Sequence, residues 1–255
     1  SDVIARRTGV KLVLSRIADL DITTDRGVEV PPGVLTTDAA EAIAESDIVV
    51  ELVGGTTVAK KSILAAIRAG KSVATANKAL LPLHGEEIFA AAEAAGVDVF
   101  YEASVAGGIP IIKALREGLV GNRIRRIYGI MNGTCNYILT RMEREGADFN
   151  TVLADAQKLG YAEANPSLDI DGFDTAHKTA ILAALAFGEW FGLEPVHVEG
   201  IRDLELADLR YADELGYRIK LLSIIKMNEG KVEMRVHPTL IPKEALLANI
   251  SDVFN

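Results

Sequence analysis

An aspartate and a lysine one helical turn apart could transfer a proton. Asp174 and Lys178 are separated by four positions, so in a helix they lie on one face. Lys178 enters a segment otherwise rich in Ala, Ile and Leu, and a buried ammonium group is costly unless a partner or ligand compensates it. A poised lysine beside a carboxylate fits removal of a hydroxyl proton while a hydride leaves the same carbon. An exposed salt bridge is the simpler alternative.

Further acids precede this pair in a loop. Glu163 and Asp169 lie in the stretch that begins at Gly160, and they could hold the ammonium group of a small substrate. His177 is adjacent to Lys178 but points to a different helix face, so we expect it to be only a neighbour. The loop and the following helix therefore predict a site for a small substrate with an amine and a hydroxyl.

Two other turns have the composition of a nucleotide site. Gly54, Gly55 and Thr56 follow a buried strand, and glycines there let the backbone approach a phosphorylated ligand. Lys78 follows the next strand in Thr75-Ala-Asn-Lys78, where it could meet a carboxylate or phosphate. A plain strand-to-helix turn and a surface lysine are the alternatives.

The segment from Glu102 to Pro110 combines an acid, two glycines and a proline. This composition keeps carbonyl groups out of regular ladders, and such carbonyls with one carboxylate could surround a hard monovalent cation. A turn that crosses between domains explains the composition equally well.

The elements that position these residues alternate in the first hundred positions, as in βαβ units around a parallel sheet. The expected strands are Lys11–Ile17, Ile48–Val53, Ser72–Thr75 and Asp98–Tyr101. The expected helices are Asp38–Glu45, Val58–Ala69 and His84–Ala95. We predict a doubly wound dinucleotide-binding domain over residues 1–108.

The pattern changes after Gly108. A strand at Arg125–Met131, a buried helix at Thr175–Phe187 and an antiparallel hairpin of Arg218–Lys226 and Lys231–Val236 predict a second, α+β domain over residues 109–255, which carries the predicted substrate site. The hairpin turn is expected at Asn228-Glu229-Gly230. The cleft between the two predicted domains is the default ligand site.

Composition excludes several classes of protein. The 255 residues carry a net charge of -9 with no basic stripe, so nucleic acid is not expected as a partner. No apolar run is long enough to cross a bilayer, and the single cysteine cannot form an internal disulfide. We therefore expect a cytoplasmic protein without a membrane partner.

Three motifs together resemble the homoserine dehydrogenases. They are Met131-Asn-Gly-Thr-Cys-Asn-Tyr-Ile-Leu139, Gly160-Tyr-Ala-Glu163 and Asp169-Ile-Asp-Gly-Phe-Asp-Thr-Ala-His-Lys178. The likeness runs along the whole chain and includes Thr75–Lys78 and Glu102–Pro110. It implies interconversion of L-homoserine and L-aspartate 4-semialdehyde with NADP or NAD, in the biosynthesis of threonine, methionine and isoleucine.

The resemblance also implies roles for residues. Lys178 matches the catalytic lysine, and Glu163, Asp169 and Asp174 match substrate-binding or catalytic acids. Lys78 matches a lysine at both cofactor and substrate, and Gly160 a cofactor contact. Glu102 with the carbonyls of Val105, Gly107 and Ile109 matches a site for sodium or potassium. The second domain's sheet commonly forms a homodimer in the family.

The family's core extends beyond both ends of this sequence. Its first strand and a G-x-G-x-x-G loop for the pyrophosphate are not found before Ser1, so the predicted sheet is incomplete and we expect a longer physical protein. After the second strand, Ala18-Asp-Leu-Asp21 favours NAD, whereas Arg16 and Arg26 leave NADP open.

Two other functions compete with the oxidoreductase. A silent nucleotide-binding or regulatory module would keep the fold, but the acids around Lys178 are all present. An acyl-enzyme semialdehyde dehydrogenase would use Cys135 as nucleophile, which requires a nearby histidine base that the sequence does not pair with it.

Overall fold

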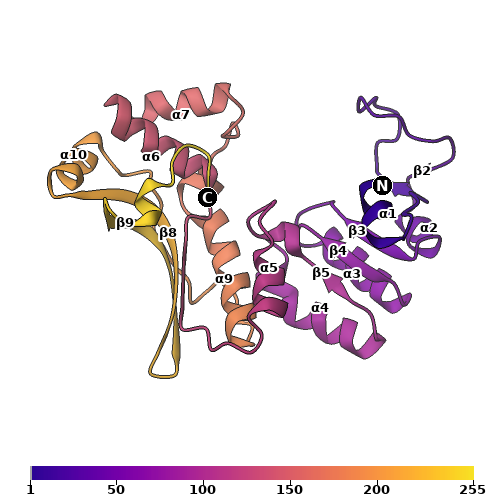
Figure 1. The fold of residues 1–255 in the computed structure, drawn as a ribbon. Helices are drawn as coiled ribbons and strands as arrows, with labels where there is room; N and C mark the ends of the chain where they lie inside the picture. The colour runs from indigo at the N-terminus through magenta and orange to yellow at the C-terminus, as the bar shows by residue number, and fades with distance from the viewer. Residues whose placement is uncertain (1) are drawn as a thin grey trace. The chain divides into compact units, whose positions relative to one another are not determined.

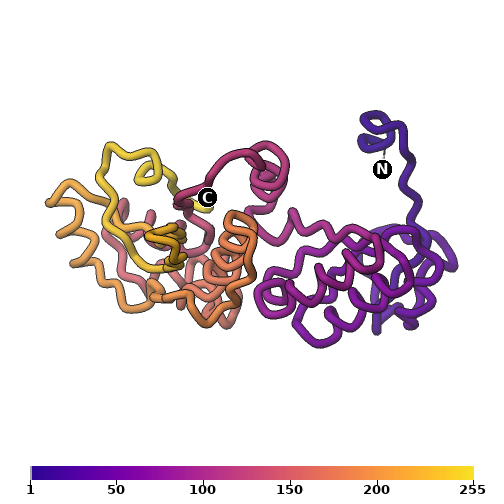
Figure 2. Tube along the Cα trace, turned by 90° about the horizontal axis from the view of Figure 1, so that it is seen from below, coloured from indigo at the N-terminus to yellow at the C-terminus, as the bar shows by residue number. Residues whose placement is uncertain are grey.

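The computed structural model describes residues 2–255, which divide into two compact units. The first unit comprises the residues up to Leu80 and His84–Tyr101; the second comprises Leu81–Leu83 and Glu102–Asn255. The trace runs through the first unit in indigo and purple and through the second in magenta to yellow (Figure 2).

Figure 1 labels most of the elements that follow one another along the chain. The α-helices are α1 (Asp2–Thr8), α2 (Ala39–Ala44), α3 (Val58–Arg68), α4 (Leu81–Ala95), α5 (Ile111–Lys113), α6 (Gly133–Glu145), α7 (Phe149–Lys158), α8 (Ser167–Ile170), α9 (Phe173–Phe187) and α10 (Leu206–Glu214). The other helical segments are the 3-10 helices η1 (Glu102–Ser104) and η3 (Leu246–Asn249) and the π-helical turn η2 (Ala114–Gly118). The strands are β1 (Ile17–Ala18), β2 (Leu35–Thr36), β3 (Ile48–Glu51), β4 (Ser72–Thr75), β5 (Val99–Phe100), β6 (Arg126–Gly129), β7 (His197–Val198), β8 (Tyr217–Asn228) and β9 (Lys231–Pro242).

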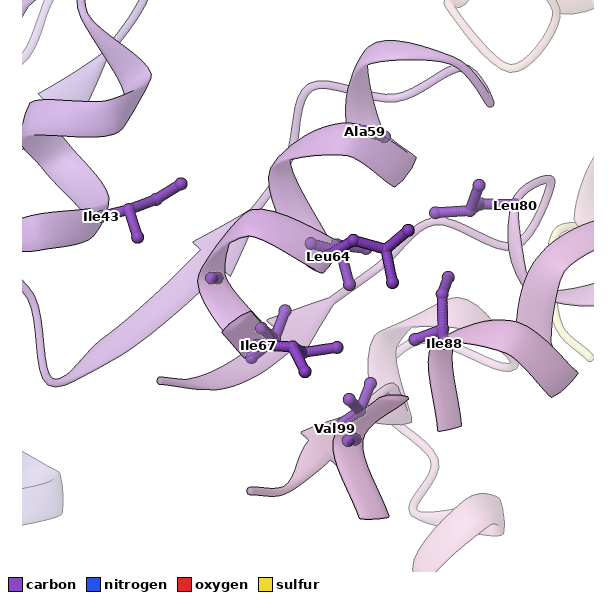
Figure 3. Packing of buried hydrophobic residues seen from close by; sticks show 11 residues of the cluster. Ile43, Ala59, Leu64, Ile67, Leu80, Ile88 and Val99 are labelled. Carbon is purple, nitrogen blue, oxygen red and sulfur yellow. The ribbon is translucent and has the colours of Figure 1, made fainter. Parts of the chain in front are cut away.

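A parallel sheet organises the first unit. Strands β3, β4 and β5 pair in that order, all parallel, with Val49 opposite Val73 and Val73 opposite Val99. Ile67 of α3 and Ile88 of α4 pack with Val99 in one buried cluster (Figure 3). The predicted α/β class with alternating strands and helices is confirmed.

The first predicted strand, Lys11–Ile17, is wrong in its extent. Only Ile17 and Ala18 form a strand, and it pairs with β2 alone among the described residues. Leu12 and Val13 are exposed. An apolar run without a neighbouring strand cannot satisfy its backbone groups in a ladder, so β-branched composition alone did not extend the strand here.

A four-stranded sheet with the order β6-β8-β9-β7 organises the second unit. Strands β8 and β9 form the predicted hairpin, and each is longer than predicted. Glu229 and Gly230 both have positive φ, 49° and 79°, as a two-residue turn of the type I′ class requires. The predicted turn is therefore confirmed.

Helix α9 is the buried helix that the sequence predicts. It begins at Phe173, two residues earlier than expected, and packs against β8 and β9. The Thr179 and Ser223 hydroxyls lie 2.7 Å apart and join the helix to the sheet. No helix within residues 2–255 is both long and apolar enough to span a membrane.

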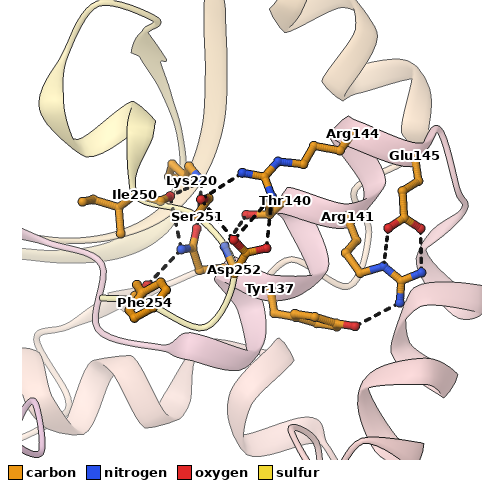
Figure 4. Close-up of polar contacts among 11 residues, drawn as sticks. Tyr137, Thr140, Arg141, Arg144, Glu145, Lys220, Ile250, Ser251, Asp252 and Phe254 are labelled. Atoms are coloured by element: carbon orange, nitrogen blue, oxygen red, sulfur yellow. Dashed lines mark hydrogen bonds and ion pairs between the residues drawn. The ribbon is translucent and has the colours of Figure 1, made fainter.

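The C-terminal segment is fastened to α6 by polar contacts (Figure 4). Asn136 donates to the carbonyl of Phe254 at 2.9 Å, and the buried Lys220 ammonium donates to Asn136 Oδ1 at 2.9 Å and to the carbonyl of Ile250 at 2.6 Å. Burial lowers the pKa of Lys220 to about 8. A neutral amine still has two N–H donors, enough for both acceptors.

Candidate active site

Asp174 and Lys178 form a largely buried ion pair in the first half of α9. Lys178 Nζ lies 2.7 Å from Asp174 Oδ2, and the two side chains are 14% and 3% exposed. Lys178 Nζ also donates to the main-chain carbonyl of Met131 at 2.6 Å. Because an ammonium group has three N–H donors and no further partner of Lys178 is found in residues 2–255, one donor is left for a ligand.

Asn132 joins this pair to a second acid. Its amide nitrogen donates to Asp169 Oδ1 at 2.7 Å and to Asp174 Oδ2 at 2.9 Å. Its amide oxygen accepts from the backbone N–H of Cys135 at 2.8 Å and so caps α6. The start of α6, the end of α8 and the start of α9 therefore meet at one side chain.

The remaining acids of the loop have different surroundings. Asp171 forms a two-bond ion pair with Arg202, at 2.7 and 2.9 Å, which lowers the pKa of that aspartate. Glu163 is exposed, and its carboxylate has no hydrogen bond or ion pair within residues 2–255. Asp171 therefore braces the loop, whereas the Glu163 carboxylate is accessible to a ligand.

The loop that carries Glu163 is attached to the first turns of α6. Thr134 donates to the carbonyl of Tyr161 at 2.6 Å, and the ring of Tyr137 packs edge-on against that of Tyr161. Gln157 donates to the carbonyl of Glu163 at 3.0 Å. Gly160 starts the loop with a φ of +77°, which favours glycine. The loop thus has a defined path beside the residues around Asn132.

Two glycines permit close backbone approach next to the site. A Cβ atom on Gly133 would lie 2.7 Å from the carbonyl oxygen of Val253, and one on Gly200 would lie 2.1 Å from that of Ile170. The close contact at Gly200 allows the N–H of Ile201 to donate to the carbonyl of Ile170 at 2.7 Å. This bond fixes the junction between α8 and α9.

We expect Gly200→Ala to destabilise the second unit by about 2 kcal/mol or more, because the new methyl group meets backbone atoms that cannot rotate away. Denaturant unfolding measures this loss. Gly188→Ala is a useful contrast, because its Cβ would meet nothing within 4 Å and only its positive φ of 75° opposes the change. Equal stability losses for the two variants would contradict the steric explanation.

The first unit places a buried carboxylate behind its glycine turn. Glu51 accepts from the N–H of Gly54 at 3.0 Å and from the Thr75 hydroxyl at 2.7 Å. Asn77 donates to the carbonyl of Gly55 at 2.7 Å. These bonds connect the carboxyl ends of β3 and β4, where the sequence places Gly54, Gly55, Thr56 and Lys78.

The segment after Tyr101 folds into a tight turn. Glu102 accepts from the backbone N–H groups of Ile112 and Lys113, both at 2.9 Å, and the carbonyl of Ile109 accepts from the N–H of Ile111 at 2.8 Å. Glu102 thus caps α5, a role that the sequence did not predict.

Both units of the chain match models of known protein families. The family model for homoserine dehydrogenase matches residues 110–255, and the model for the NAD-binding domain of homoserine dehydrogenase matches residues 2–102. The chain belongs to the homoserine dehydrogenase family. The resemblance drawn from the three motifs is thereby confirmed, as is a Rossmann-type NAD-binding domain followed by a catalytic domain.

Individual homoserine dehydrogenases agree with this assignment. That of Neisseria gonorrhoeae is 49% identical over 257 residues, covering 100% of this chain and 59% of the relative. The crystal structure of the Thiobacillus denitrificans homoserine dehydrogenase has a TM-score of 0.93 and 51% identity, covering 99% of this chain and 59% of that one. A hyperthermophilic archaeal homoserine dehydrogenase in complex with NADPH has a TM-score of 0.71 and 29% identity, over 82% and 61% of the chains. The chain thus spans about three fifths of the length of these homoserine dehydrogenases.

Within this homoserine dehydrogenase fold, Cys135 is poorly suited to be a nucleophile. It is buried, and its thiol donates to the carbonyl of Asp169 at 3.2 Å. Burial raises the pKa of the thiol, and the nearby Asp169 and Asp174 carboxylates raise it further. Because the thiolate is the nucleophilic form, the structure disfavours an acyl-enzyme mechanism at this residue.

Sequence reasoning missed the two groups that bring the acids and the lysine together. Asn132 and the carbonyl of Met131 lie at the start of the Met131–Leu139 motif, directly before α6. An asparagine at a helix start is a recognisable capping signal. The signal predicts the bond to Cys135, but it carries no information on the two aspartates that the same side chain holds.

Proposed function

We propose that the whole protein catalyses the NAD(P)-dependent interconversion of L-homoserine and L-aspartate 4-semialdehyde. The observation that supports it best is the Lys178 ammonium, held by Asp174 and the Met131 carbonyl with one donor left over. A positioned donor of this kind suits a substrate oxygen that alternates between hydroxyl and carbonyl.

Oxidation of homoserine removes a hydride from the hydroxyl-bearing carbon and a proton from its oxygen. In our proposal the neutral amine of Lys178 accepts this proton, and in the reverse direction its ammonium donates the proton to the developing alkoxide. Asp174 holds the lysine side chain in place through a charge-assisted hydrogen bond of 2.7 Å.

The hydride acceptor is the nicotinamide cofactor, NADP or NAD, which supplies the two-electron step when bound. We propose that Gly54, Gly55, Thr56 and Lys78 hold it, together with Gly160. The residues present suit such a ligand: Gly54 and Gly55 have φ values of 75° and 67°, and a Cβ atom on either would point into open space. A ligand can thus approach the backbone of this turn closely.

We propose that Glu163, Asp169, Asp174 and Lys78 bind the substrate, with Glu163 and Asp169 near its ammonium group. Glu163→Ala is then expected to raise the KM for homoserine by about 10-fold or more with a smaller change in kcat, because a uniform binding contact is lost. Steady-state kinetics measure this. Glu189→Ala removes an exposed carboxylate outside the loop and serves as the control. An unchanged KM for Glu163→Ala would remove Glu163 from the site.

We also propose that Glu102 and the carbonyls of Val105, Gly107 and Ile109 bind sodium or potassium. Each of these oxygens has a further lone pair beyond any N–H bond it accepts, so the donor set fits a hard cation. Activity is expected to fall when a bulky tetraalkylammonium ion replaces both cations and to return when either is added back. Indifference to this exchange would contradict the cation site.

The proposed function also has consequences for the assembly, the domain division and the location of the protein. We propose a homodimer formed through the sheet of the second domain, a domain division at residues 1–108 and 109–255, and a role in threonine, methionine and isoleucine biosynthesis. The one cysteine is a free thiol, which suits a reducing compartment, and we place the protein in the cytoplasm.

The deciding experiment is a spectrophotometric assay of the full-length protein with homoserine and either NAD or NADP. Homoserine-dependent formation of the reduced cofactor at 340 nm is the expected result. No reaction with either cofactor, in folded full-length protein, would overturn the proposal.

A further inference from the structure

The buried amide of Asn132 occupies an unusual place among charged groups. It is 5% exposed and lies within hydrogen-bond distance of two carboxylates, those of Asp169 and Asp174. Both of its N–H donors are used by these acids, at 2.7 and 2.9 Å. The donor side of the amide thus faces negative charge, and the acceptor side faces the N–H of Cys135 at 2.8 Å.

The Asn132 amide weakens the electrostatic repulsion between the Asp169 and Asp174 carboxylates, which burial would otherwise strengthen. Like charges close together in a poorly solvated site disfavour the ionised state of both. A shared donor offsets part of that repulsion and also fixes where each oxygen lies. Asp174 Oδ2 is the same atom that contacts Lys178 Nζ, so the amide bears directly on the geometry of the lysine.

We infer that Asn132 is a positioning residue for the reaction: it fixes Asp174, and through it Lys178, together with Asp169. The inference rests on the proposed function. Asn132 acts through Asp169 and Asp174, and it is assigned no contact with substrate or cofactor.

Mutation can separate the role of the amide oxygen, which caps α6, from that of the amide nitrogen, which donates to the two acids. Asn132→Ser keeps an oxygen that can cap α6, because serine is about as good an N-cap as asparagine, but it loses the two donors to the acids. Asn132→Asp keeps the cap and replaces the donors with a third carboxylate. Asp148→Ser changes the N-cap of α7 in the same way as a matched control, since Asp148 accepts from the N–H of Thr151 at 3.0 Å.

The test is steady-state kinetics on the full-length protein, with the wild type assayed first. We expect Asn132→Ser to lower kcat by about 10- to 100-fold, because small displacements of a catalytic group have effects of this size. Asn132→Asp is expected to lose at least as much, and Asp148→Ser to keep normal turnover. Thermal unfolding identifies any variant that is not folded. If Asn132→Ser does not fold, Asn132→Asp takes its place as the test variant.

A double-mutant cycle distinguishes positioning from a general structural effect. In an Asp174→Ala background, Asn132→Ser should change kcat by less than about threefold, because Asp174 Oδ2, through which Asn132 reaches Lys178, has gone and only the bond to Asp169 remains. The same fold loss in both backgrounds, or wild-type turnover of Asn132→Ser, would overturn the inference. A wild type without dehydrogenase activity would instead count against the proposed function, so the two failures are distinguishable.

Discussion

Lys178→Ala is expected to lower kcat by about two to four orders of magnitude, the usual contribution of a positioned proton-transfer group. The substitution removes the N–H donor of Lys178 that is left for a ligand, along with the bonds to Asp174 and to the carbonyl of Met131. Steady-state kinetics of the full-length protein, in both reaction directions, measure the change.

The control for this variant is Lys158→Ala on α7, where the side chain is 76% exposed and, among residues 2–255, pairs only with Asp155 at 3.3 Å. That pair contributes little to stability or activity. Lys178→Ala leaves Asp174 without its cationic partner, so some loss of stability is expected, although the Asn132 amide still satisfies the carboxylate. Near-normal turnover in a folded Lys178→Ala protein would show that Lys178 does not transfer the proton.

Asp174→Asn is expected to lower kcat by about 100-fold while changing the volume of the side chain very little, because the lysine loses the charge that orients it. The variant tests charge and orientation, since the amide can still lie beside Lys178. Kinetics as a function of pH are the measurement, because the pH dependence of kcat reports on the groups that transfer the proton.

Asp171→Asn is the matched control, three residues earlier at the end of α8. Its carboxylate pairs with Arg202 at 2.7 Å, so neutralising it should reduce stability more than turnover. If Asp171→Asn lowered kcat as much as Asp174→Asn, the effect would reflect the shape of the loop and not the charge beside Lys178.

Local patterns predicted those parts of the fold that depend on neighbouring residues. The β8–β9 turn follows from Asn228-Glu229-Gly230, because the glycine readily adopts the positive φ that the turn requires at its second position. The buried helix α9 follows from its Ala- and Leu-rich composition, and the Asp174–Lys178 contact from a separation of four residues in that helix.

The remaining features depend on segments that are distant in the sequence. The bonds of Asn132 to Asp169 and Asp174 span 37 and 42 positions, and no local pattern encodes them. Gly200 resembles any loop glycine until the fold brings the carbonyl of Ile170 against it. The strand predicted at Lys11–Ile17 is present only at Ile17–Ala18, because the composition of a segment favours a strand but does not provide the neighbouring strand with which it must pair.

The fastening of residues 250–254 to α6 has a consequence for the order of folding. Asn136 bonds to the carbonyls of Ile250 and Phe254, across 114 and 118 positions. Because a chain is synthesised from its N-terminus, these bonds cannot form until residue 254 has left the ribosome, and contacts so distant in sequence form slowly. Helix α6, which begins beside Asn132, therefore acquires these contacts only after β8 and β9 have been translated.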